Sequence, residues 1–147
     1  MFAKTLPLVA ALALLAGAAS ASETIIVQML NKGEDGAMVF EPSFIQAQPG
    51  DTVTFVPTNP GHNAATLEDL VPEGAEAFDG DLGKEISITV TAEGLYGVKC
   101  TPHVGMGMVA LIQAGAPTNL EAAQAVAEGL RGKAKERFEA DLAQVVQ

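Results

Sequence analysis

The sequence has few of the side chains that most protein chemistry uses. Its 147 residues include one cysteine, two histidines, one tyrosine and no tryptophan. A single cysteine excludes an intramolecular disulfide and any zinc site that needs several thiolates. Whatever chemistry the chain carries must therefore rest on very few residues.

Basic residues are also scarce. Eight Lys and Arg stand against 18 Asp and Glu, which gives a formal net charge of −10 at pH 7. A protein that binds a phosphate backbone needs cations that displace counterions, so we expect no nucleic-acid partner. With 48% hydrophobic residues, a chain of this length can bury one compact core, and we expect one folded domain.

The N-terminal residues have the order of a secretory signal peptide. Lys4 precedes an uncharged apolar run from Leu6 to Ala19, and the small residues Ser20 and Ala21 follow. We predict cleavage after Ala21 and a mature domain that spans 22–147. A membrane anchor is the alternative, but the apolar run is shorter than the roughly 20 residues that a spanning helix needs. We therefore expect no membrane insertion after cleavage.

Short strand-like segments separated by turn residues extend to about residue 116. The segment 85–91 alternates between apolar and polar residues with period two, which is typical of a half-buried strand. The other predicted strands are 24–30, an extended stretch over 38–48 that Pro42 interrupts, 52–57, 94–100 and 108–113. The acidic segment 61–84 is predicted to be mostly loop, with a short helix near 68–71. This pattern predicts an all-β sandwich or barrel.

Two helices are predicted after Pro117, over about 118–146. The run from Thr118 to Glu121 matches a capping box, and an apolar repeat at helical spacing follows it. The second helix covers about 133–145. Its apolar stripe is Ala134, Phe138, Leu142 and Val145, and its acidic residues away from the stripe are Glu136, Glu139 and Asp141. Because such short helices are not stable alone in water, we expect them to pack against the sandwich.

The scarce cysteine and histidines fall in loops or at strand ends. His62 follows the predicted strand 52–57, Cys100 and His103 form a Cys-x2-His motif, and Met108 comes five residues later. One thiolate, two imidazoles and a weak thioether are the donor set of a blue-copper site. Taken singly, the cysteine and Met108 could be core residues and the histidines turn residues, and Met106 is a second candidate thioether. The combination is far more specific than its members.

Blue-copper sites transfer electrons, and two other functions use similar residues. A copper carrier or buffer binds the metal with soft ligands, but such proteins usually present exposed Met-rich or Cys-rich sites rather than one closed set. A cysteine hydrolase would use Cys100 as nucleophile and a histidine as base. His103 is only three residues away on a tight loop, and the sequence offers no evident group to orient it. The residues therefore favour electron transfer over these two functions.

Several longer segments carry a resemblance to a known family. They are 29–33 (MLNKG), 36–42 (GAMVFEP), 55–58 (FVPT), 62–63 (HN), 94–103 (GLYGVKCTPH) and 105–108 (GMGM). The sequence resembles the cupredoxins and, among them, the pseudoazurins, across essentially the whole mature chain. The resemblance implies a Greek-key β-sandwich with two C-terminal α-helices and one type I copper ion. It also implies an electron carrier in the periplasm, not an enzyme.

The resemblance implies roles for single residues. His62, Cys100 and His103 would be the equatorial copper ligands, and Met108, not Met106, the axial one. Two asparagines would support them: Asn63 would brace the two ligand loops together, and Asn31 would approach the cysteine sulfur. The residues implied as an apolar patch around His103, through which electrons leave, are Met38, Pro102, Val104 and Met106.

The implied partners are transient redox proteins, such as copper nitrite reductase or c-type cytochromes, that meet a monomeric carrier. The related proteins carry many lysines, which attract them to acidic partners. Here the candidates near the site are only Lys32, Lys84 and Lys99. Between Glu68 and Glu85 there are seven acidic residues against Lys84 alone. The sequence departs from the family pattern in this charge balance.

Overall fold

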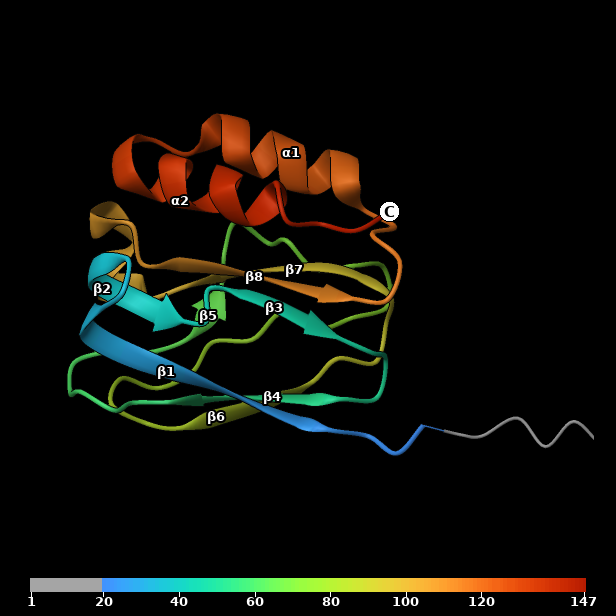
Figure 1. Ribbon diagram of the computed structural model, residues 1–147, viewed down its shortest axis with the longest axis horizontal. Coiled ribbons are helices and arrows are strands. Elements are labelled where there is room, and N and C mark those ends of the chain that lie inside the picture. Colours follow the sequence, from blue (N-terminus) through green and yellow to red (C-terminus); the bar gives the residue numbers. More distant parts are fainter. Residues whose placement is uncertain (1–19) are drawn as a thin grey trace, which may run out of the picture.

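Two four-stranded sheets pack face to face, and two helices cover the outer face of one of them (Figure 1). The computed structural model describes residues 20–147, so the predicted signal peptide lies almost wholly outside the described residues. No helix within 20–147 is long and apolar enough to cross a membrane. The predicted sandwich with two C-terminal helices is confirmed.

The first sheet has the strand order β2-β1-β4-β6. Its strands are β1 (Thr24–Gly33), β2 (Gly36–Glu41), β4 (Thr52–Val56) and β6 (Ile86–Thr89). β1 pairs antiparallel with β2 and parallel with β4, and β6 closes the sheet antiparallel to β4. The alternating segment 85–91 thus contains the edge strand β6, whose residues alternate between half-buried and exposed.

The second sheet has the order β3-β8-β7-β5. Its strands are β3 (Phe44–Ala47), β5 (Ala65–Thr66), β7 (Gly94–Lys99) and β8 (Val109–Ala114). β8 lies in the middle, parallel to β3 and antiparallel to β7, and all six of its residues are buried. One face of β8 meets the sandwich interior and the other meets the helices, which explains its almost continuous apolar sequence.

Apolar side chains form two clusters on either side of the second sheet. The inner cluster lies between the sheets and includes Phe40, Phe55 and Tyr96 together with Cys100 and Met108. The outer cluster lies between the same sheet and the helices α1 (Leu120–Gly129) and α2 (Gly132–Leu142). The helices are therefore held by tertiary packing, as their length requires.

The structure confirms one local prediction and corrects another. Pro42 interrupts the extended stretch 38–48, as predicted: β2 ends at Glu41, and the chain continues as β3 in the second sheet. The segment 68–71 is not helical. Glu68 and Asp69 have φ of 47° and 56°, in the left-handed region that a right-handed helix excludes.

Two predictions about the C-terminal helices were wrong in detail. The N-cap of α1 is Asn119, and no side chain caps the helix. The Asn119 side chain instead bonds the backbone of Leu95. Its Oδ1 accepts from the Leu95 N–H at 2.7 Å, and its Nδ2 donates to the Leu95 C=O at 2.9 Å. Asp141 is not on the solvent side of α2: it is 3% exposed, and the Ser43 hydroxyl donates to its Oδ1 at 2.8 Å. Both side chains serve tertiary contacts that local spacing does not reveal.

Candidate metal centre

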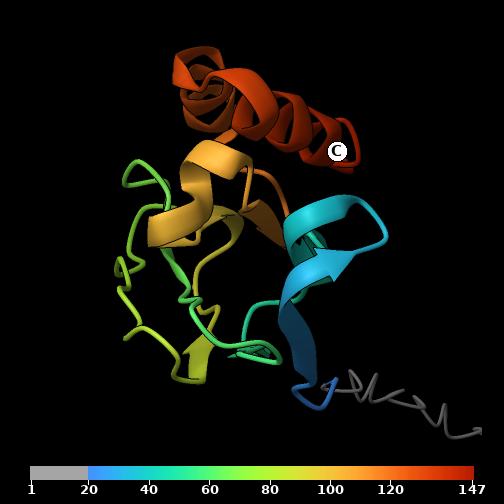
Figure 2. The same ribbon diagram turned by 90° about the vertical axis from the view of Figure 1, so that its left-hand side faces the viewer.

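Two loops at one end of the sandwich bring the scarce residues together. His62 lies between β4 and β5, Cys100 directly follows β7, and Met108 directly precedes β8. Since β7 and β8 are antiparallel neighbours, Cys100 and Met108 leave the sheet side by side, and the Cys100 N–H donates to Met108 C=O at 3.0 Å. Figure 2 looks onto this end of the molecule.

The residues between Cys100 and Met108, predicted to be a loop, form the short 3₁₀ helix η1 (Thr101–Met106). Pro102 stands at its start, where a missing N–H does no harm. Gly107 ends it with φ of 93°, a left-handed conformation that suits glycine. The Met108 N–H then donates to His103 C=O at 3.2 Å. This turn carries His103 back toward Cys100.

Three potential donor atoms converge at the centre. The Nδ1 atoms of His62 and His103 are 3.1 Å apart, and Cys100 Sγ lies 3.7 Å from the first and 3.4 Å from the second. No other group of at least three His, Cys, Asp or Glu side chains within 20–147 is placed so that it could hold a metal ion. Met108 is fully buried beside this triangle, whereas Met106 is 50% exposed on η1.

Asn31 on β1 sets the protonation pattern of the His62 ring. Its Oδ1 lies 2.8 Å from His62 Nε2. An amide oxygen can only accept, so Nε2 carries the proton and the neutral ring presents an unprotonated Nδ1 to the cysteine. The approach of Asn31 to the cysteine sulfur, which the resemblance implied, stays a prediction beside this contact. The orientation suits a metal, because the His62 Nδ1 lone pair and the cysteine sulfur face one point, with His103 Nδ1 beside them.

Burial shapes the electrostatics of the same group. His62 and Cys100 are fully buried, and His103 is half-buried. Burial, with a smaller contribution from His103, lowers the pKa of His62, which favours the neutral, metal-binding imidazole. Burial raises the pKa of the Cys100 thiol, and backbone hydrogen bonds from Asn63 and His103 oppose that rise. The net rise favours the protonated thiol, so a metal that binds the thiolate would have to displace this proton.

Asn63, the neighbour of His62, connects the two ligand loops. Its Oδ1 accepts from the Thr101 N–H at 2.7 Å, and its Nδ2 donates to Thr101 Oγ1 at 3.1 Å and to Gly80 C=O at 3.0 Å. One side chain thus joins the His62 loop, the cysteine loop and the acidic segment. The roles of Thr101 and Gly80 as its partners were not foreseen, because nothing in their local sequence marks them.

The four residues of the expected apolar patch differ in exposure. Pro102 and Met106 are exposed on η1, while Val104 is half-buried and packs toward the helices. Met38 on β2 is also half-buried and packs against the inner cluster. β2 of the β1–β2 hairpin contacts η1, the element that carries His103, and both lie at the end of the molecule that faces the viewer in Figure 2.

Charged residues surround this end unevenly. Lys32 and Lys84 are exposed and Lys99 is half-buried. All seven acidic residues between Glu68 and Glu85 are exposed. This segment adjoins the histidine loop, because the Gly83 N–H donates to His62 C=O at 2.8 Å. Asp79 and Asp81 therefore give the metal end an acidic border on the side of β5. The part of the segment near Glu73 lies at the opposite end of the sandwich, because Pro72 lies against Gly94 at the start of β7.

Comparisons with known proteins agree with the donor set. The family described as copper binding proteins, plastocyanin/azurin family, matches residues 27–115. A pseudoazurin of Paracoccus pantotrophus is 51% identical over 146 residues, which cover 99% of each chain. A putative pseudoazurin of Rhizobium leguminosarum bv. viciae is 49% identical over 94% of this chain and 91% of that protein. The crystal structure of native pseudoazurin from Hyphomicrobium denitrificans aligns with a TM-score of 0.76 and 43% identity, over 84% of this chain and 99% of that one.

Proposed function

The chain belongs to the copper-binding plastocyanin/azurin family and, within it, to the pseudoazurins, and from this premise we propose that it carries single electrons between periplasmic redox proteins. Members of this group are copper-binding electron carriers and not enzymes. We also propose which residues bind the copper, that the chain is exported, and which partners it meets.

His62 Nδ1, Cys100 Sγ and His103 Nδ1 would hold the copper, with the Met108 thioether as a weaker fourth donor. When bound, copper supplies a Cu(II)/Cu(I) couple that takes up or releases one electron. The observation that carries the proposal is the convergence of the three donor atoms within 4.8 Å, with the His62 tautomer already set by Asn31. Burial of Met108 beside Cys100, against the exposure of Met106, supports Met108 as the axial ligand.

The surrounding chain keeps the ligands in place in both oxidation states. Asn63 ties the two ligand loops together, and the buried His62, Cys100 and Met108 exclude water. A site that does not rearrange lowers the reorganisation cost of each electron transfer. Electrons leave through the half-buried His103, between the exposed Pro102 and Met106. A small apolar patch suffices, since redox encounters are weak and use small interfaces.

The leader over residues 1–21 exports the protein, which we place in the periplasm as a monomer. A periplasmic reductase such as copper nitrite reductase is the proposed acceptor, and a c-type cytochrome is a further candidate partner. The exposed acidic residues beside His62 require that the docking face of the partner present positive charge there. Lys32, Lys84 and Lys99 are the candidate lysines for steering a partner at this end.

A copper-loaded sample tests the function. We expect an intense blue absorption band after oxidation with ferricyanide, because a thiolate bonded to Cu(II) produces it. Cys100→Ser should remove the band, while Met106→Leu, a matched change at the exposed methionine, should keep it. Tightly bound copper without a blue band in the wild-type protein would favour a copper carrier or buffer and would overturn the proposal.

A further inference from the structure

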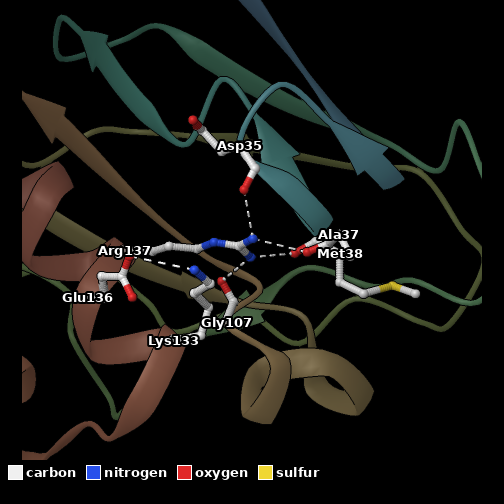
Figure 3. A network of polar contacts seen from close by, with 7 residues as sticks. All are labelled: Asp35, Ala37, Met38, Gly107, Lys133, Glu136 and Arg137. Atoms are coloured by element: carbon white, nitrogen blue, oxygen red, sulfur yellow. Dashed lines mark hydrogen bonds and ion pairs between the residues drawn. The ribbon is translucent and has the colours of Figure 1, made fainter.

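Arg137 on α2 makes an unusual set of contacts at the metal end of the molecule. Its guanidinium donates four hydrogen bonds, all to backbone carbonyls (Figure 3). Nη1 donates to Met38 at 2.9 Å and to Gly107 at 3.0 Å, and Nη2 donates to Asp35 at 3.0 Å and to Ala37 at 3.1 Å. One rigid, planar cation therefore joins the C-terminal helix, the β1–β2 hairpin and the ligand loop.

The carbonyl of Gly107 matters because of its position in the chain. It belongs to the same planar peptide unit as the N–H of Met108. Arg137 donates a hydrogen bond to the oxygen of this peptide, and the N–H of the same peptide donates to His103 C=O at 3.2 Å. The peptide that leads into Met108 is thus fixed at both ends, and its plane determines the direction in which the Met108 side chain leaves the backbone.

The helix also contacts this peptide by packing. A Cβ atom added to Gly107 would lie 2.5 Å from Lys133 Cγ and 2.9 Å from Lys133 Cβ. The first turn of α2 therefore lies directly against the loop, with no space for a side chain. Charge pairing does not explain the orientation of Arg137, because the ion pairs found along this helix within the described residues are Lys133–Glu136 and Lys135–Glu139.

We propose that Arg137 is a positioning residue for the axial ligand: it fixes the Gly107–Met108 peptide and thereby the approach of the Met108 thioether to copper. The inference rests on the proposed function, with Met108 as the axial donor. A long axial bond is weak and is the one through which a protein tunes the reduction potential of such a site. A small displacement of the peptide should therefore alter the potential while the equatorial ligands stay in place.

The same guanidinium links the axial ligand to the surface. Met38 has φ of 53°, a left-handed conformation that is uncommon for a residue with a side chain. Arg137 bonds the carbonyls of both Ala37 and Met38, which holds this turn in register with η1. The hairpin that contacts η1 and the peptide that leads into Met108 are thus fixed by one side chain.

Three variants of the copper-loaded full chain test the inference. Arg137→Met removes all four bonds and keeps an unbranched side chain, and Arg137→Lys keeps the charge but loses the planar fork. Lys135→Met is the matched control, because Lys135 bonds Ala127 C=O and Glu139, away from the ligand loop. The measurements are the visible spectrum, the EPR signal and the reduction potential, with amide exchange of Met108 in the copper-free protein.

We expect Arg137→Met to retain a blue band with a changed ratio of visible bands, a changed EPR rhombicity and a shifted potential. Exchange of the Met108 amide should accelerate about tenfold or more, because hydrogen bonds from a charged donor are the strong class. Arg137→Lys should shift the same properties less, and Lys135→Met should shift none of them. If Arg137→Met does not fold, Arg137→Lys alone decides.

A variant at Arg137 with the wild-type spectrum, potential and amide exchange would overturn the inference. Equal shifts in Lys135→Met would also overturn it, because they would show a general effect of helix packing. Failure of the proposed function is a separate result. It would be seen in the wild-type protein, as copper binding without a blue band, before any variant is compared.

Discussion

Replacing Asp141 by asparagine tests the energetics of the buried carboxylate between α2 and β3. Asp141 is 3% exposed, Ser43 donates to its Oδ1, and its Oδ2 has no hydrogen-bond partner. Burial raises its pKa from 3.8 to about 7, the Ser43 bond opposes the rise, and the nearby Asp35 adds to it. Below its folded pKa the carboxyl is protonated, and no charge is buried.

The sign of the pH dependence follows from proton binding. Between the unfolded and folded pKa values the folded chain holds a proton at Asp141 that the unfolded chain has lost. Stability therefore falls as pH rises from about 4 to 7 and levels off above 7. The difference between 3.8 and about 7 corresponds to a cost of about 4 kcal/mol at high pH. Between pH 5 and pH 8 the cost grows by about 2 to 3 kcal/mol.

Asp141→Asn removes this pH-dependent cost and keeps an oxygen that accepts from Ser43. We expect the free energy of unfolding of the variant, relative to wild type, to rise by about 2 to 3 kcal/mol from pH 5 to pH 8. Urea unfolding of the copper-free proteins measures it, and the difference between variant and wild type cancels the other titrating groups. Glu128→Gln, an exposed acid on α1, is the control and should show no such trend. A difference for Asp141→Asn that does not change with pH would refute the reasoning.

Three further predictions concern the metal end. Met108→Gln should shift the reduction potential and the visible spectrum, and Met106→Gln should change neither; the reverse would identify Met106 as the axial ligand. Asn63→Ala leaves the Thr101 N–H without its partner, so unfolding should be easier by about 1 to 3 kcal/mol in calorimetry or denaturant titration, and an unchanged stability would contradict the bracing role. The rate of electron transfer to a basic c-type cytochrome should fall as ionic strength rises from about 0.01 to 0.15 M in stopped-flow experiments, and a rate that rises with salt would show that the acidic border does not attract the partner.

The sequence predicted most of the fold because its patterns are local. Strict alternation over 85–91 located β6, and helical spacing after Pro117 located both helices. The errors came from contacts between distant residues. Asn119 bonds the backbone of Leu95, and Asp141 turns inward to Ser43 across 98 residues of chain. No short stretch of the sequence contains both residues of such a contact.

The donor set could be predicted because the candidates were so few. One cysteine and two histidines left little choice, and the structure brings all three together. The supporting contacts were less accessible to sequence reasoning. The contact of Asn31 with His62 joins residues 31 positions apart, which no local pattern reveals. Arg137 is separated by 99 residues from Met38, whose carbonyl it holds.

A reductive titration that counts copper ions and electrons per chain tests the central claim most directly. The oxidised protein should contain one copper, accept one electron, lose its blue band in proportion, and regain the band in full on reoxidation. A chain that binds copper but takes up no electron reversibly, or that never shows the band, would contradict the account of a one-electron carrier built on His62, Cys100, His103 and Met108.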